Sequence, residues 1–148
     1  MNQRIKASVK YLVQKHGTRD PEAIAKGEGI NIVYKPYSQG TKGYYINVNG
    51  SKYIVINENL DEYTRQVVLS HELGHAMHHS DHDIYFIREH TFLSTNIYED
   101  EANAFAAELL IDCNDIDEVQ LENMSIEQIS KYFRVTPELV EYKFKNKK

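Results

Sequence analysis

The most chemically informative segment of the chain is His71-Glu72-Leu73-Gly74-His75, which has the form H-E-x-x-H. On a helix, residues four apart share one face with Cβ atoms roughly 5–6 Å apart, so His71 and His75 can present two imidazoles to one ion. Glu72 lies about 100° around the helix, close enough to reach a water on the metal but badly placed to be a ligand. The pattern therefore predicts one Zn²⁺ per chain, with two histidine ligands and Glu72 as the catalytic general base.

The surroundings of this motif strengthen the metal interpretation. Val67, Val68 and Leu69 precede it, which indicates a buried helix. Gly74 lies between the two histidines, where glycine costs about 1 kcal/mol relative to alanine, so we expect it to allow another backbone to approach closely. A purely structural zinc site has four protein ligands and no use for Glu72. The motif therefore favours an enzyme over a structural zinc module.

A catalytic zinc ion takes three protein ligands and keeps one position for water, so a third ligand must come from elsewhere in the chain. One candidate is Asp81, ten residues after His71, where metzincin patterns carry their last ligand. That pattern has glycine where His78 stands here, and no methionine lies where a Met-turn would be expected. Asp81 is therefore the least favoured candidate.

The other candidates for the third ligand open a strongly amphipathic helical segment. We favour Glu99, with Glu101 or Asp100 as alternatives, because the alanines that follow would let this helix pack tightly on the histidine helix. Asn103 lies four residues after Glu99 and shares its face. Its side chain could orient a zinc histidine through the ring N–H, or it could be a helix-surface amide.

The two segments together resemble the ImmA/IrrE family of metallopeptidases. The string E-x-x-A-N-x-F-A-A-x-L-L at residues 99–110 is much more specific than H-E-x-x-H, and an I-x-I-N string at 54–57 precedes the histidine helix. The likeness covers roughly residues 28–112, and it implies Glu99 as the third ligand in the gluzincin style. Ile111-Asp112 stand where the family often has Met-Pro, which changes the helix exit and not the zinc chemistry.

The resemblance also implies a role. It suggests a zinc endopeptidase that cleaves a protein regulator, a helix-turn-helix repressor or anti-repressor partner, and so derepresses phage, mobile-element or stress genes. The alternative is a non-catalytic zinc-binding module that sequesters a repressor. The oxyanion-stabilising residue and the scissile bond stay open.

Hydrophobic periodicity predicts the elements that must hold these residues. We expect helices over residues 2–16, 20–27, 62–79 and 98–112, shorter helices after 125 and 136, and strands over 30–36, 44–48 and 52–56. Asn49-Gly50 suits a two-residue hairpin turn, because both positions require positive φ. Residues 80–97 have no clean period and should form an irregular connection. The predicted fold is α+β: a small three-stranded antiparallel sheet, a gluzincin-like helical core and a C-terminal helical tail.

The length of 148 residues predicts a single domain. Within it we expect N-terminal helices over 1–27, a catalytic core over 28–112 and a C-terminal helical region over 113–148. Residues 127–140 resemble a helix-turn-helix in their helix lengths, but the second helix begins with Glu138 and Glu141 where a DNA-reading helix would be basic. We therefore expect a hairpin that caps the core or docks a protein, without direct nucleic-acid binding.

Composition excludes several classes of protein. Hydrophobic residues make up 41% and charged residues 26%, with 11 Tyr and 5 Phe, which is too apolar for a disordered chain. No apolar run is long enough for a membrane span, and lysines interrupt the first 17 residues, where a secretory signal would be apolar. The single Cys113 excludes an internal disulfide and a thiolate zinc cluster, and we expect it to act as a small hydrophobe. These features predict a cytoplasmic protein.

Charge is distributed unevenly along the chain. Residues 81–127 hold 13 acidic residues and one basic residue, a formal charge of −12, whereas the remainder carries 16 basic and 9 acidic residues, or +7. Such an acidic block can steer a basic partner, or it can be a solvated surface. His78, His79 and His82 follow the motif, and we expect solvated histidines at the helix end in preference to a second metal site.

Overall fold

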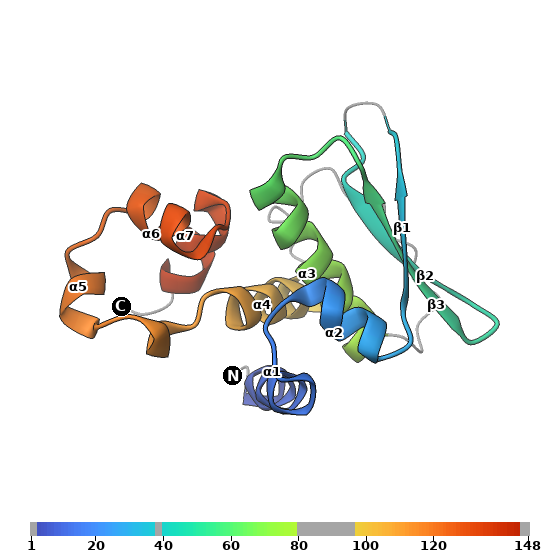
Figure 1. The fold of residues 1–148 in the computed structure, drawn as a ribbon, viewed down its shortest axis with the longest axis horizontal. Helices are drawn as coiled ribbons and strands as arrows, with labels where there is room; N and C mark the ends of the chain where they lie inside the picture. The colour runs from blue at the N-terminus through green and yellow to red at the C-terminus, as the bar shows by residue number, and fades with distance from the viewer. Residues whose placement is uncertain (1–2, 38–39, 80–96, 146–148) are drawn as a thin grey trace.

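The computed structural model describes residues 3–37, 40–79 and 97–145, an α+β arrangement of helices beside one small sheet (Figure 1). The described helices are α1 (Gln3–His16), α2 (Pro21–Gly27), α3 (Glu62–His78), α4 (Ile97–Leu110), α5 (Glu118–Glu122), α6 (Ile126–Phe133) and α7 (Pro137–Lys145). The described strands are β1 (Asn31–Lys35), β2 (Gly43–Val48) and β3 (Ser51–Asn57), and a 3₁₀ turn lies at Cys113–Asp115. The irregular connection predicted for 80–97 falls almost entirely outside the described residues.

The sheet is mixed, so the prediction of an antiparallel sheet is wrong for its first strand. The strand order is β1-β3-β2, with β3 antiparallel to β2 and parallel to β1. The hairpin turn forms as predicted, with φ of 51° at Asn49 and 89° at Gly50. After β1 the chain forms β2 at the opposite edge of the sheet. The hairpin then places β3 between β1 and β2, where it runs parallel to β1. Its apolar run, Ile54 to Ile56, is buried, as suits a central strand.

Helix α3 is the central element of the fold, and it contacts both the sheet and α4 (Figure 1). It starts at the predicted N-cap, where the backbone N–H of Thr64 donates to Asp61 Oδ1 at 2.9 Å. Every residue from Val67 to Ala76 is buried, because the helix has packing partners on several sides. The two histidines predicted to bind metal, and Glu72, therefore lie on a buried stretch of α3.

The close helix contact predicted at Gly74 is present. A Cβ atom at this position would lie 3.0 Å from the Cβ of Phe105 and 3.2 Å from the Cα of Ala102, both on α4. Only glycine leaves room for α4 at this distance without a shift of either helix. The missing side chain therefore sets the spacing of the two helices that carry the predicted ligands.

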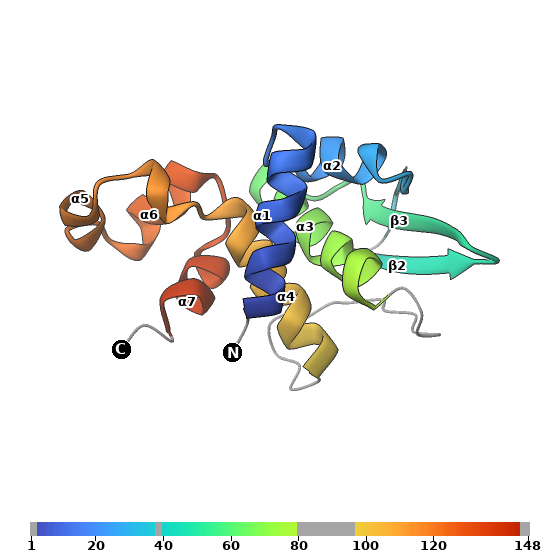
Figure 2. The same cartoon turned by 90° about the horizontal axis from the view of Figure 1, so that it is seen from below.

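The terminal helices pack against this central pair. Helix α1 crosses α4 and buries Ile5, Val9 and Leu12 in the main core (Figure 2). Helices α6 and α7 form a second apolar cluster together with residues of α3, α4 and the turns that follow α4 and α6. Its buried members are Val67, Ala106, Ala107, Ile111, Ile129, Val135, Leu139 and Val140. The C-terminal helices thus cover the core, as the helical-hairpin interpretation expected, and the half-buried Cys113 packs against the same cluster. No helix in the described ranges is long and apolar enough to cross a membrane.

Candidate metal centre

Helices α3 and α4 bring His71, His75 and Glu99 together, and their potential ligand atoms all lie within 4.8 Å of one another. The Nε2 atom of His71 is 3.0 Å from Oε1 of Glu99, and Nε2 of His75 is 2.8 Å from Oε2 of the same carboxylate. The three side chains are at most 1% exposed. Each imidazole thus directs the same ring nitrogen to a different oxygen of one buried carboxylate.

The charges of this cluster suit a metal site. Burial lowers the pKa of His75 to about 4, although Glu99 opposes the shift, so this imidazole is neutral at physiological pH. Burial alone would raise the pKa of Glu99, but the contacts with the two histidines outweigh burial and hold it well below its usual range. A neutral imidazole and an ionised carboxylate are the forms that bind a metal ion.

The donor set and its spacing fit zinc. Two histidine nitrogens and one glutamate oxygen form a set found in catalytic zinc sites. Ligand atoms around a tetrahedral zinc ion lie roughly 3.4 Å apart, given bonds of about 2.0–2.1 Å. The contacts of 3.0 and 2.8 Å between these histidines and Glu99 are shorter by only a few tenths of an ångström. The most widely spaced pair of ligand atoms, up to 4.8 Å apart, would have to close to about 4.2 Å or less, so the side chains must shift by roughly half an ångström for all three to bind one ion.

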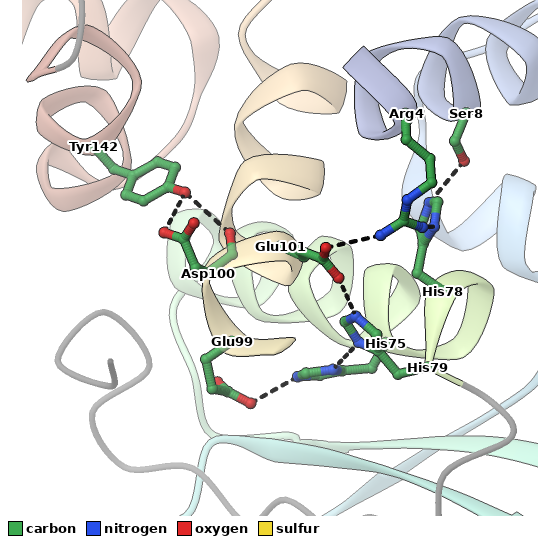
Figure 3. A network of polar contacts seen from close by, with 9 residues as sticks. All are labelled: Arg4, Ser8, His75, His78, His79, Glu99, Asp100, Glu101 and Tyr142. Carbon is green, nitrogen blue, oxygen red and sulfur yellow. Dashed lines mark hydrogen bonds and ion pairs between the residues drawn. The ribbon is translucent and has the colours of Figure 1, made fainter. Parts of the chain in front are cut away.

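The alternative third ligands on α4 point elsewhere (Figure 3). Glu101 contacts His79 at 2.8 Å and Arg4 at 2.8 Å. Asp100 accepts a hydrogen bond of 2.9 Å from the hydroxyl of Tyr142 on α7. Neither carboxylate belongs to the cluster, and Asp81 lies outside the described residues. Among the described candidates, the geometry selects Glu99.

Glu72, which adjoins His71 in the sequence, and Asn103, four residues after Glu99, are both buried. Glu72 is 0% exposed on α3, and its role as general base stays a prediction. Asn103 is 3% exposed, so the helix-surface interpretation is wrong. Its Oδ1 atom has no hydrogen-bond partner among the described residues, so the contact with a zinc histidine that we expected is not formed there.

A histidine that we expected to face water lies buried beside His75. His79 is 3% exposed and contacts His75, so the prediction of a solvated histidine is wrong for it. His78 is half-buried between Arg4 and Ser8, and His82 lies outside the described residues. The reason is tertiary, since α1 and α4 cover the end of α3 that would otherwise face water. The spacing of His79, four residues after His75, was the signal available in the sequence.

Two comparisons relate the chain to known proteins. The IrrE N-terminal-like domain of the Peptidase_M78 family matches residues 25–145, which include the C-terminal helices as well as the metal cluster. "Uncharacterized immunity region protein 2" of Bacillus phage phi105 is 42% identical over 107 residues, which are 72% of this chain and 68% of the phage protein. The chain therefore belongs to the IrrE N-terminal-like family of peptidases, Peptidase_M78.

Proposed function

We propose that the chain is a zinc-dependent endopeptidase that cleaves a protein regulator, a helix-turn-helix repressor of phage or mobile-element genes, in the cytoplasm. The observation that carries this proposal is the buried cluster of His71, His75 and Glu99, with Glu72 beside the first histidine on the same helix. Membership of a peptidase family supports hydrolysis of a peptide bond.

The chain's own residues divide the chemistry between them. His71, His75 and Glu99 would hold Zn²⁺, which when bound would polarise the scissile carbonyl and lower the pKa of a water molecule toward about 7. Glu72 would take a proton from the attacking water and pass it to the leaving amine, a contribution of about 10²–10⁴-fold. Because Glu72 is adjacent to a proposed ligand on a buried helix, its carboxylate would lie near the attacking water without competing for the metal.

The proposed substrate class follows from two supporting observations. The phage relative is named as an immunity region protein, which is consistent with a role in regulating phage genes. The chain also exposes acidic residues on its C-terminal side, including Asp115, Asp117 and Glu118. A DNA-binding repressor is basic, so this surface is complementary to it in charge and opposed to DNA itself.

Substitution of the general base tests the proposal. Glu72→Gln should keep a zinc content of about one per chain, equal to that expected of the parent, and should lose about 10²–10⁴-fold in the rate at which it cleaves a candidate helix-turn-helix repressor. His75→Ala is the matched control, and it should lose both stoichiometric zinc and cleavage.

The results separate the two functional hypotheses. Full turnover by Glu72→Gln would contradict the mechanism. A parent protein that binds zinc and protects the repressor's DNA-binding surface without cutting the chain would support the sequestering module.

A further inference from the structure

A line of polar contacts runs outward from the metal cluster to the N-terminal helix (Figure 3). Nδ1 of His75 lies 2.9 Å from Nδ1 of His79, and Nε2 of His79 lies 2.8 Å from Oε1 of Glu101. The other oxygen of Glu101 accepts a hydrogen bond of 2.8 Å from Nη2 of Arg4. The line joins three helices, because the histidines come from the end of α3, Glu101 from α4 and Arg4 from α1.

The chemistry of these groups gives the line a direction. If Nε2 of His75 supplies its lone pair to a metal ion, Nδ1 must carry the ring proton and donate it. Nδ1 of His79 is then the acceptor, so Nε2 of His79 carries a proton and donates to Glu101. Arg4 can only donate, which keeps Glu101 an acceptor. Every hydrogen bond is satisfied in one arrangement, and that arrangement leaves the correct nitrogen of His75 available to the metal.

Burial decreases steadily along the same line. The side chains of His75 and His79 are 0% and 2% exposed, Glu101 is 19% exposed, and Arg4 is 61% exposed. The contact between His75 and His79 is therefore shielded from water, which could otherwise replace His79 as acceptor. The second ring nitrogen of His71, in contrast, has no hydrogen-bond partner among the described residues.

We propose that His79 is a positioning residue, which sets the tautomer and ring orientation of His75, and that Glu101 and Arg4 hold His79 in place. The inference rests on the proposed metal centre and deepens it, because it makes the N-terminal helix a support of that centre. Partners of this kind contribute about 10–100-fold to metal affinity in other zinc sites.

The test measures zinc affinity by competition with a chromophoric chelator, without any assay of cleavage. His79→Leu should weaken binding about 10–100-fold, because it removes the acceptor of the His75 proton. His79→Asn should recover part of this loss, since its amide oxygen can stand near Nδ1 and accept that proton. Glu101→Gln should weaken binding by about threefold to tenfold, because it removes the charge that directs His79.

Two matched controls separate positioning from general damage. Asp100→Asn removes a carboxylate from the same turn of α4, but one that faces Tyr142, and His78→Asn removes a neighbouring imidazole that contacts Arg4 and Ser8. Both should bind zinc within about twofold of the parent. Unfolding of each variant in the presence of chelator checks that the metal-free protein folds, and if His79→Leu does not, His79→Asn and Glu101→Gln carry the test.

A second readout reports the orientation of the ligands. The visible absorption of the Co²⁺-substituted protein should change in His79→Leu and return toward that of the parent in His79→Asn. Parent-like affinity and an unchanged Co²⁺ spectrum in folded His79→Leu would overturn the inference and leave the metal centre intact. Equal losses in the control variants would also overturn it. A parent protein that binds no stoichiometric zinc would instead refute the metal centre, and the inference with it.

Discussion

Glu99 and Glu101 are separated by one residue on α4, yet the tertiary structure assigns them to different histidines. Glu99 is completely buried and meets both His71 and His75, whereas the partly exposed Glu101 meets His79. Asp100, between them, turns to Tyr142. At the scale of single residues, the site therefore depends on which carboxylate enters the space between the two imidazoles.

This assignment predicts the effects of removing each carboxylate. Glu99→Ala should weaken zinc binding by more than about 100-fold, because loss of a ligand exceeds the loss expected from removing a ligand's hydrogen-bond partner. Asp100→Asn and Asp81→Ala should stay within about twofold of the parent in the same chelator competition. A larger loss in Asp81→Ala than in Glu99→Ala would move the site toward the metzincin arrangement.

At the scale of elements, the distance between α3 and α4 decides whether the ligands meet. Gly74→Ala should destabilise the metal-free protein by up to about 2 kcal/mol, because overpacking costs about 1–3 kcal/mol and the gain in helix propensity returns about 1 kcal/mol. Its zinc affinity should also fall, since the added methyl group pushes against Phe105 and Ala102 on the helix that carries Glu99. Denaturant unfolding and chelator competition measure the two effects.

Ser70→Ala provides the comparison on the same helix. Ser70 is 0% exposed, and its hydroxyl has no hydrogen-bond partner among the described residues, so alanine should leave the unfolding free energy unchanged or raise it slightly. Stabilisation by both alanine substitutions would show that the contact at Gly74 is not tight.

The N-cap of α3 gives a second prediction at this scale. Asp61→Ala should lower the unfolding free energy by about 1 kcal/mol at neutral pH, because it removes the acceptor for the Thr64 N–H. The hydrogen bond from that N–H lowers the pKa of Asp61 below its usual value. The stabilisation is therefore complete above the ordinary carboxyl pKa and is lost as pH falls through the lower value of the folded protein.

Denaturant unfolding from pH 7 down to pH 3 checks this dependence. The difference between parent and Asp61→Ala should shrink at the acid end. Asp61→Asn keeps an acceptor at the N-cap but cannot ionise, so it should stay close to the parent at neutral pH. A difference between parent and Asp61→Ala that is constant with pH would exclude the charged cap.

At the scale of the whole molecule, the sheet and the C-terminal helices lie at opposite ends, with α3 and α4 between them (Figure 1). The acidic block of the sequence includes the exposed residues Asp115, Asp117 and Glu118, at and just before α5. Asp117 also accepts a hydrogen bond from the backbone N–H of Gln120, as the cap of this short helix. These exposed charges can act at a distance on a partner, whereas Glu99 of the same acidic block is buried in the cluster with His71 and His75.

Neutralising this surface should slow cleavage of a basic repressor. The triple variant with Asp115→Asn, Asp117→Asn and Glu118→Gln should lose about twofold to tenfold in kcat/KM at low salt, because electrostatic steering raises association rates. The deficit should disappear at high salt, since exposed charges are already screened over about 8 Å at physiological ionic strength. Zinc content should not change, and asparagine at 117 keeps the helix cap. Equal salt dependence in parent and variant would indicate a merely solvated acidic surface.

Local rules account for most of what the sequence predicted. The i, i+4 spacing of His71 and His75, the cap at Asp61 and the turn at Asn49-Gly50 each depend on residues a few positions apart, so they could be read directly from the chain. The helix bounds followed from the same short-range patterns. The choice of Glu99 needed more, because geometry alone left other carboxylates open and the family resemblance favoured it.

Contacts between distant parts of the chain decided the rest. Glu99 meets a histidine 28 positions away, and Arg4 meets a carboxylate 97 positions away. The parallel pairing of β1 with β3 depends on which sheet edge the chain builds first, and the burial of His79 depends on α1 and α4 covering the end of α3. No local pattern encodes these outcomes, since they arise from packing helices and strands around a shared core, and only the folded chain brings His79, Glu101 and Arg4 into one line of contacts with His75.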